Sequence, residues 1–325
     1  MNTGRAVSTV GDVTLALLLL SAAMAVLVTF VETGERDHDP METEYTTETL
    51  LSSTMNTTYY PERALGEFHG GNVYDETDYE RRDLRRVSHG PIVAQVADIA
   101  QTQTAVDHDA IRRSPGTKAP SQAAEEYRAR IDEKLQARLV NVSFETNVSA
   151  VWEPLDGGPI RGAAAVGGTP PAYEDVSATT ITVPSDIPSV RKEAIDAVED
   201  PDDFGVVAEV VAEAVVEGYL PELESQRALE GGGVEGDLTA YRYLWMADTI
   251  DLGSEARDDL AEYLEPGTAN ATAANELLIE ELSAQLAAYL EPASGPPESG
   301  PLGDAKTAAA SITTGQVTVT VRTWT

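Results

Sequence analysis

The feature that most constrains this chain is an uncharged apolar segment close to its start. Residues 13–31 carry no charge over 19 positions and contain neither Pro nor Gly. A helix of that length spans about 28 Å, close to a hydrocarbon core of about 30 Å. Arg5 precedes the segment, whereas acidic residues dominate positions 32–39, so the positive-inside rule orients the N-terminus toward the cytoplasm. The segment therefore predicts a single transmembrane helix, with the rest of the chain extracellular.

Two other interpretations of the segment compete with a retained anchor. Ala23-Met24-Ala25 has the small-x-small pattern of a signal-peptide cleavage site. The apolar run continues past that site to residue 31, whereas a signal peptide normally turns polar there. The third interpretation is a pilin-type stem that packs against copies of itself. We expect a retained helix, either as an anchor or as such a stem.

Charge and cysteine content exclude several classes of protein. The chain has 55 acidic and 22 basic residues and a formal net charge of -33, which disfavours binding to a nucleic-acid backbone. A hydrophobic content of 42% argues for a folded chain rather than a disordered one. The excess of Asp and Glu then indicates a strongly hydrated surface of the kind that halophiles use. Because there is no Cys, disulfides, thiolate metal sites and cysteine nucleophiles are excluded.

Changes in hydrophobic period divide the rest of the chain into helical and strand regions. Apolar residues recur at helical spacing over residues 92–106 and 121–139, and then every second residue over 142–152. Residues 160–166, 175–183 and 316–323 are predicted as further strands. The fold class expected is α+β, with one transmembrane helix followed by an extracellular mixed domain that has an antiparallel sheet and a helical insertion.

Proline and glycine content sets the predicted domain boundaries. Residues 189–291 are helical in pattern, and we predict that they are an insertion after which the last strand returns to the sheet. The segments assigned are as follows: 1–12, cytoplasmic N-region; 13–31, transmembrane helix; 32–60, acidic and Thr-rich stalk; 61–188, α+β ectodomain; 189–291, helical insertion; 292–304, Pro/Gly linker; 305–325, C-terminal strand.

No motif in the sequence indicates a reaction. There is no P-loop, no G-x-S-x-G and no H-E-x-x-H, and no two of the four His residues lie three to five positions apart. We therefore assign no catalytic residue, no cofactor and no metal, and expect a protein that is not an enzyme. A hydrolase whose site the sequence does not reveal remains an alternative, because the 55 acids could include a catalytic pair.

Asn-x-Ser/Thr tripeptides mark candidate sites of N-glycosylation. They begin at Asn56, Asn141, Asn147 and Asn270, all on the predicted outer side. Asn141 and Asn147 fall on the polar face of the predicted strand, where a sugar could be accommodated. We hypothesise that at least one of the four carries a glycan.

The start of the chain resembles a known family. Residues 5–10, Arg-Ala-Val-Ser-Thr-Val, run straight into the apolar segment and resemble the N-terminus of haloarchaeal type IV pilins. Residues 8–10, 151–154, 175–180 and 321–324 resemble haloarchaeal pilin-like membrane proteins that accompany archaeal pilus-type secretion machinery.

The resemblance implies a role and a processing site. It implies cleavage by a prepilin peptidase near Arg5, Ala6 and Val7. It also implies a non-enzymatic component of an archaeal pilus or secretion system, whose partners are the membrane and other pilin-like subunits, with no nucleic acid. The location expected is the cell membrane, with the C-terminal domain outside. A binding or structural module unrelated to pili is the alternative.

Overall fold

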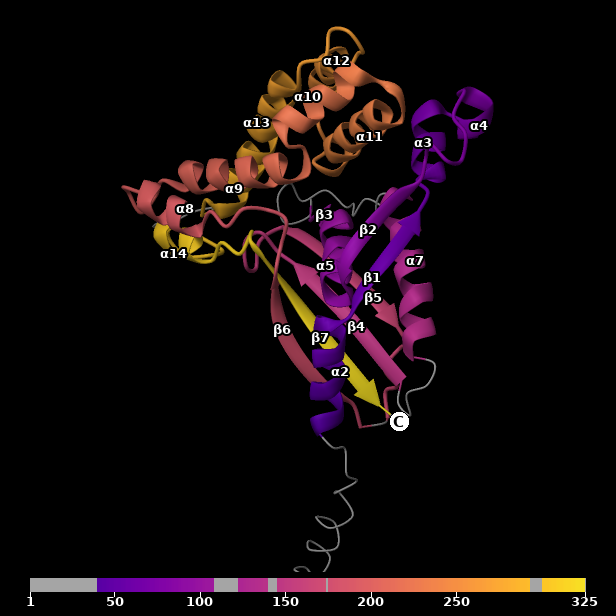
Figure 1. Ribbon diagram of the computed structural model, residues 1–325. Helices are drawn as coiled ribbons and strands as arrows, with labels where there is room; N and C mark the ends of the chain where they lie inside the picture. Colours follow the sequence, from indigo (N-terminus) through magenta and orange to yellow (C-terminus); the bar gives the residue numbers. More distant parts are fainter. Residues whose placement is uncertain (1–39, 108–121, 140–144, 174, 293–299, 325) are drawn as a thin grey trace, which may run out of the picture. The chain divides into compact units, whose positions relative to one another are not determined.

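The computed structural model describes residues 40–107, 122–139, 145–173, 175–292 and 300–324 (Figure 1). By its internal contacts the chain divides into two units, Met1–Glu42 and Thr43–Thr325. Of the first unit, only residues 40–42 are described, as the first turn of helix α2 (Pro40–Ser52). The other described residues belong to the second unit.

An antiparallel sheet of five strands organises the second unit. Its order is β3-β5-β4-β7-β6, and each neighbouring pair is antiparallel. The strands are β3 (Thr104–Val106), β4 (Glu145–Trp152), β5 (Ile160–Gly167), β6 (Ser177–Pro184) and β7 (Gln316–Trp324). The mixed α+β architecture with an antiparallel sheet is thus as predicted.

Alternation of side chains explains why one face of the sheet is buried. In β4, Val148, Ala150 and Trp152 are fully buried, and in β7 Val317, Val319 and Val321 are as well. Successive residues of a strand point to opposite faces, so these positions share the covered face of the sheet. The alternation that predicted a strand over residues 142–152 is therefore confirmed from residue 145 onward, where the structure describes the chain.

The last strand returns to the sheet after a long helical excursion. β7 lies between β4 and β6, with Val148 opposite Val321 and Ile181 opposite Val319. This is the pairing predicted for residues 316–323. The helices between β6 and β7 are α8 (Arg191–Ala197), α9 (Phe204–Tyr219), α10 (Glu222–Gly231), α11 (Gly233–Thr249), α12 (Ser254–Tyr263), α13 (Ala271–Leu290) and α14 (Ala305–Ala310).

Both ends of the helical excursion are bound to one buried residue. The carbonyl oxygen of Thr314 accepts hydrogen bonds from Trp152 Nε1 at 2.9 Å and from Ser185 Oγ at 2.7 Å. The Thr314 hydroxyl donates to the carbonyl oxygen of Pro188 at 2.6 Å. The chain therefore leaves the sheet after β6 and comes back before β7 at the same point.

Two helices pack on the sheet, and a two-stranded hairpin packs on these helices. Helix α5 (Ile92–Thr102) contacts β4 and β5, and α7 (Gln122–Leu139) contacts β5 (Figure 1). Strands β1 (Thr54–Tyr59) and β2 (Arg86–Pro91) form a separate antiparallel pair. The residues between them form two short helices, α3 (Glu62–His69) and α4 (Val73–Glu76).

The structure differs from the sequence prediction in this first part. Residues 40–60 were expected as part of a stalk, but α2 and β1 occupy them, and Leu50 and Met55 belong to the main core. Residues 92–106 were expected as one helix, but α5 ends at Thr102 and Val106 lies in β3. Val106 fits either period, so local spacing could not separate helix from strand there.

The predicted fold class is wrong in its membrane-spanning helix. No helix among the described residues is long and apolar enough to cross a membrane. The longest, α13, has 20 residues but carries Glu276, Glu280 and Glu281. The segment predicted to span, residues 13–31, lies outside the described residues.

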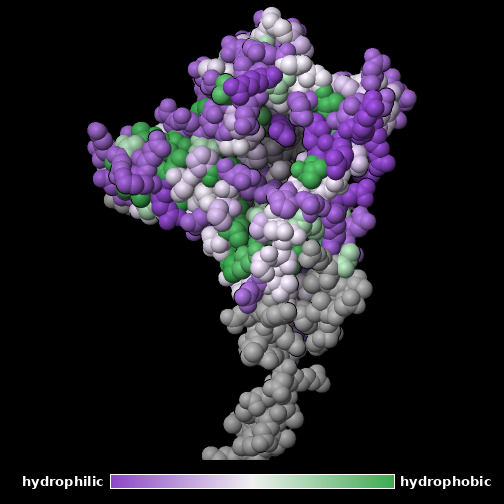
Figure 2. Space-filling model, viewed as in Figure 1, coloured by the Kyte–Doolittle hydropathy of each residue, from purple (hydrophilic) through white to green (hydrophobic). Residues whose placement is uncertain are grey.

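Hydrophilic residues dominate much of the visible surface. In Figure 2 they cover most of the helices that lie between β6 and β7, and most of α3 and α4. A chain with a net charge of -33 keeps its acids hydrated in this way, because an ionised carboxylate is costly to bury without a partner.

The contact between α5 and β5 requires glycine at position 162. A Cβ atom at Gly162 would lie 2.0 Å from the carbonyl oxygen of Ala100, which is backbone and has no rotamer to change. We expect Gly162→Ala to lower the free energy of unfolding by about 1–3 kcal/mol, as overpacking in a close-packed core does. Urea denaturation followed by circular dichroism measures this.

Gly205→Ala is the matched control for that substitution. A Cβ there, in the first turn of α9, would meet only Asp203 Oδ1, at 3.9 Å. This variant should keep its stability or gain up to about 1 kcal/mol, because alanine fits a helical backbone and has fewer conformations in the unfolded chain. If the two variants have the same stability, the close approach of α5 to β5 is wrong.

Candidate functional site

The predicted processing site lies outside the described residues. That holds for Arg5, Ala6 and Val7, and also for the sequon at Asn141. Cleavage at residues 5–7, the pilin-like partners and a surface location therefore stay predictions from the sequence.

Two of the sequons are exposed. Asn56 lies in β1, where its Oδ1 contacts His89 Nδ1 at 2.6 Å. Asn270 is the N-cap of α13, and its Oδ1 accepts from the backbone N–H of Ala273 at 3.1 Å. Both contacts use the side-chain oxygen, whereas a glycan attaches to the nitrogen. Both sites are thus sterically open to modification.

Asn147 is placed differently from the expectation for a polar strand face. Its side chain is buried, with 7% exposed, and its Nδ2 donates to the carbonyl oxygen of Gly168 at 2.9 Å. Arg322 from the neighbouring strand β7 lies over it, with Nη1 3.3 Å from Asn147 Oδ1. The nitrogen that would carry a sugar is therefore already engaged.

The arginine cluster of residues 81–86 pairs with acids. Arg81 Nε lies 3.4 Å from Glu62 Oε1, and Arg82 pairs with two acids of its own segment. Arg86 Nη2 lies 2.9 Å from Glu235 Oε1, an ion-pair contact that lacks hydrogen-bond geometry. The cluster is thus largely neutralised, partly by acids that are distant in sequence.

A cleft between α5 and α11 is the strongest candidate for a functional site. It encloses about 300 Å³, and its walls come from β1, β2, α5, α7, α9, α11 and the loop after β6. We call it the α5–α11 cleft. No trio of His, Asp or Glu side chains arranged for a metal ion occurs among the described residues, in the cleft or elsewhere.

Helix α5 presents one polar face to the cleft. Asp98, Gln101 and Thr102 all line it. These residues are three and four positions apart, so they stand above one another on one side of the helix. The opposite side of α5 carries the apolar residues that pack on the sheet, among them Val96 and Ile99, both fully buried.

Helix α11 forms the facing wall with a stripe of large side chains. Leu238, Tyr241, Arg242, Trp245 and Met246 line the cleft at helical spacing. Arg242 is exposed, whereas Leu238, Tyr241 and Met246 are buried. This wall therefore presents an apolar and aromatic surface and one guanidinium group to the cleft.

Asp98 is the most unusual group in the cleft. Burial, together with the neighbouring carboxylate of Asp186, raises its pKa to about 7. A hydrogen bond from Tyr127 opposes this shift, but Tyr127 Oη is 3.5 Å away, the outer limit for such a bond, and also lies 2.8 Å from Ser88 Oγ. Asp98 is therefore a mostly buried carboxyl group that receives only one long hydrogen bond from the described residues.

The loop after β6 brings Asp186 to this wall. The backbone N–H of Asp186 donates to Gln101 Oε1 at 3.3 Å, and the hydroxyl of Ser185 accepts from the N–H of Ile187 at 3.1 Å. A Cβ at Gly218 would lie 2.6 Å from Ile187 Cγ1, so α9 approaches this loop closely. The position of the Asp186 backbone is fixed by these contacts.

Aromatic rings line the body of the cleft. The rings of Tyr59 and Tyr127 have centroids 4.9 Å apart. Tyr219 lies edge-on to Trp152 at 6.0 Å and to Trp245 at 6.3 Å. The hydroxyl of Tyr219 donates to the carbonyl oxygen of Gln101 and lies 2.7 Å from Thr104 Oγ1, so it holds α5 in place.

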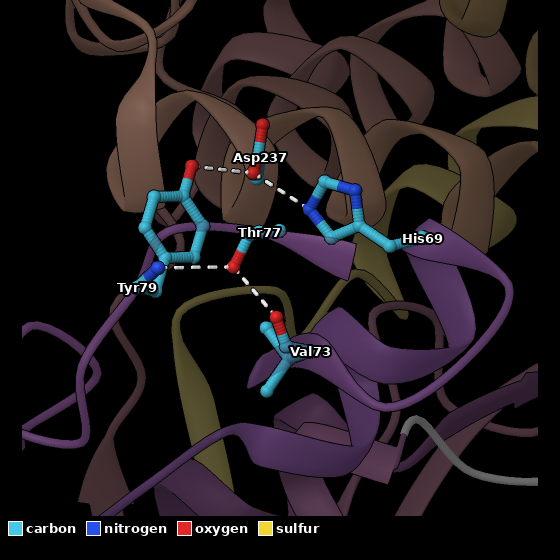
Figure 3. A network of polar contacts seen from close by, with 5 residues as sticks. All are labelled: His69, Val73, Thr77, Tyr79 and Asp237. Atoms are coloured by element: carbon cyan, nitrogen blue, oxygen red, sulfur yellow. Dashed lines mark hydrogen bonds and ion pairs between the residues drawn. The ribbon is translucent and has the colours of Figure 1, made fainter. Parts of the chain in front are cut away.

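A polar network joins α3 and the segment after α4 to the start of α11 (Figure 3). Asp237 Oδ2 accepts from Tyr79 Oη at 2.7 Å and lies 2.8 Å from His69 Nε2. Thr77 bridges within its own segment, donating to the carbonyl oxygen of Val73 and accepting from the N–H of Tyr79. Neither hydroxyl of the network is bonded to His69, since Tyr79 donates to Asp237 and Thr77 to a backbone carbonyl. The network positions the α11 residue next to Leu238 of the cleft.

The sequence analysis did not identify the cleft residues. The signals available were the 98, 101, 102 spacing on α5 and the 238, 241, 242, 245 spacing on α11. Each pattern also fits a helix that simply packs in a core. Only the fold brings the two faces together with Tyr59, Tyr127 and Asp186.

Comparison with known proteins identifies a family. A family model described as "Family of unknown function (DUF7284)" matches residues 11–324. The chain belongs to this family. The DUF7284 match includes every residue of the α5–α11 cleft. Neither the curated proteins nor the solved structures include a significant match. Family membership names no activity, so function has to be argued from the cleft.

The placement of the sequons predicts which of them can be modified. If the protein is glycosylated, we expect an unmodified Asn147 and glycans at Asn56, at Asn270 or at Asn141, which lies outside the described residues. Glycopeptide mass spectrometry of the native protein measures the occupancy of each site. A glycan on Asn147 would contradict the hydrogen bond from its side-chain nitrogen to Gly168.

The raised pKa of Asp98 predicts a pH-dependent stability. The group has a pKa of about 7 when folded and an ordinary value near 4 when unfolded, so the folded protein binds its proton more tightly. Ionisation of Asp98 therefore lowers the free energy of unfolding progressively from about pH 4 to about pH 7. Asp98→Asn removes this loss, so the variant should gain stability over the natural protein as the pH rises.

Urea denaturation at about pH 5.5 and about pH 8 measures the difference. The gain should reach at most a few kcal/mol, since one pKa unit corresponds to about 1.4 kcal/mol. Glu126→Gln should show the same trend, because burial also raises the pKa of Glu126 to about 7. A stability difference between Asp98→Asn and the natural protein that does not change with pH would refute the raised pKa.

Proposed function

We propose that the protein is a binding module that holds a small ligand in the α5–α11 cleft. The observation that carries the proposal is Asp98. Within the described residues its carboxyl group is supported by a single long hydrogen bond, from Tyr127, and by no ion pair. A carboxylate withdrawn from water without a close partner costs stability. A perturbed group of this kind in a cleft is a physical indication of a functional site.

The walls of the cleft suit a small organic ligand. Binding sites for small molecules are mostly apolar and aromatic, with a few polar groups that fix orientation. Here Tyr59, Tyr127 and Trp245 supply the aromatic surface, and Asp98 and Arg242 supply charged groups. A volume of about 300 Å³ is at the lower end of the range for ligand sites, about 300–1,000 Å³. The ligand should therefore be small.

A hydrolase is the second candidate, and the same residue favours it. A carboxylic acid with a pKa near 7 can act as a general acid at neutral pH. Asp98 has that pKa, and Asp186 provides a second carboxylate close enough to raise it. Asp186 is exposed on its loop, whereas Asp98 is mostly buried, so the two groups have the different environments that an acid and a base require.

Ligand-observed NMR tests the proposal. The full chain is screened against small amines, carboxylic acids, amino acids and neutral sugars, and each hit is repeated with Asp98→Asn. We expect at least one ligand to lose about tenfold or more in affinity, equivalent to about 1.4 kcal/mol. Thermal melting establishes that the variant is folded.

Glu126→Gln is the matched control in that screen. Glu126 shares the raised pKa of Asp98 but does not line the α5–α11 cleft. Its substitution should leave the affinity unchanged. Hits that bind Asp98→Asn as tightly as the natural protein, or a screen without hits, would refute the binding module. Turnover of an ester or glycoside that Asp98→Asn abolishes would instead establish the hydrolase.

A further inference from the structure

The charges of the α5–α11 cleft are separated by sign. The two acids come from α5 (Asp98) and the loop after β6 (Asp186), which we call the acidic wall, and the two arginines come from β2 (Arg86) and α11 (Arg242), the basic wall. Asp186 is the charged group that acts on Asp98, and no arginine contributes to the shift of its pKa. Opposite charges that were simply paired with each other would lie in contact, and within the described residues these do not.

Tyr59 lines the cleft together with the charged groups of both walls. Burial raises the pKa of its hydroxyl. Arg242 and Arg86 lower that pKa, and Glu235 and Asp98 raise it further. The hydroxyl is therefore within the electrostatic influence of both arginines and of Asp98. A ligand resting on Tyr59 therefore has positive charge at one end and negative charge at the other.

Three of the four charged groups of the cleft lack an ionic partner among the described residues. Asp98 and Asp186 have none, and no described acid lies within ion-pair distance of the guanidinium of Arg242. Arg86 is different, because Glu235 lies 2.9 Å from its Nη2. Asp186 is exposed to water, whereas Asp98 is mostly buried, so Asp98 and Arg242 are the acidic and the basic residue of the cleft that we expect to bind a ligand.

We propose that the ligand is a small zwitterion, with an ammonium group at Asp98 and a carboxylate at Arg242. Its apolar part lies against the rings of Tyr59, Tyr127 and Trp245. This inference rests on the proposed function and deepens it by naming the chemical class of the ligand. A purely anionic ligand would be repelled by the acidic wall, and a purely cationic one by the basic wall.

The α-amino acids are the simplest probes of this class. Isothermal titration calorimetry on the full chain uses the protein-forming α-amino acids, with L-phenylalanine as the reference compound. Two matched analogues share its phenyl body but keep one charge each, namely phenethylamine with the ammonium and 3-phenylpropionate with the carboxylate. We expect binding of one or more amino acids, and for L-phenylalanine an affinity at least about tenfold above that of either analogue.

Two substitutions assign the charges to the walls. Asp98→Asn should weaken the binding of L-phenylalanine and phenethylamine about tenfold, and should not weaken that of 3-phenylpropionate, because the cleft loses a charge that repels it. Arg242→Gln should weaken L-phenylalanine and 3-phenylpropionate to a similar extent, and should not weaken phenethylamine, for the same reason. Arg227→Gln is the control for Arg242, because Arg227 is an exposed arginine of α10 that does not line the cleft. Circular dichroism confirms that each variant is folded.

The outcomes separate this inference from the function on which it rests. Equal binding of phenethylamine and L-phenylalanine, with no effect of Arg242→Gln, would establish a cation site and overturn the zwitterion. Asp98-dependent binding of a neutral sugar, with no amino acid bound up to about 10 mM, would likewise overturn it while the binding module stands. Failure of every compound class in the NMR screen as well would overturn both.

Discussion

Helix α5 lies so close to the sheet that the carbonyl oxygen of Ala100 occupies the space a side chain at residue 162 would need. The rest of the described structure depends on this contact. The apolar side of α5, with Val96 and Ile99, covers β4 and β5 and closes the core. The direction of the helix is then fixed, and so are the positions of Asp98, Gln101 and Thr102 on its other side. A single helix thus supplies both core packing and one wall of the cleft.

The same helix also holds the β1–β2 hairpin. Gln95 is 1% exposed, and its Nε2 donates to the carbonyl oxygens of Met55 at 2.7 Å and Gly90 at 3.0 Å. The hydroxyl of Thr57, fully buried, donates to Gln95 Oε1 at 2.7 Å. Every polar atom of this buried amide side chain is therefore satisfied, as buried polar groups require. Tyr59 and Arg86 of the hairpin reach the cleft because the hairpin is attached here.

The helices inserted between β6 and β7 complete the cleft from the other side. Thr314 binds the two ends of the insertion to Trp152, so the block starts and ends at a rigid point of the sheet. Asp237 binds the first turns of α11 to His69 and Tyr79. With α11 held at this end, its aromatic and basic stripe faces Asp98. The weak support of Asp98 contrasts with the full satisfaction of Gln95 on the same helix, and this contrast points to a ligand rather than to packing.

The sequence by itself determined the local elements and the mixed class of the fold. Alternation in residues 145–152 and 316–324 specified strands, and the helical spacing of Tyr127, Ile131 and Leu135 specified α7, because these periods depend on backbone geometry alone. Tertiary structure decided what those faces meet. Asn147 lies on the polar face by alternation, yet Arg322 and Gly168 cover it. Asp98 is an ordinary helix acid in the sequence, and it becomes a perturbed group only where the fold buries it and brings Asp186, 88 positions away, close to it. Burial and electrostatic coupling arise from groups distant along the chain, so no local pattern contains them.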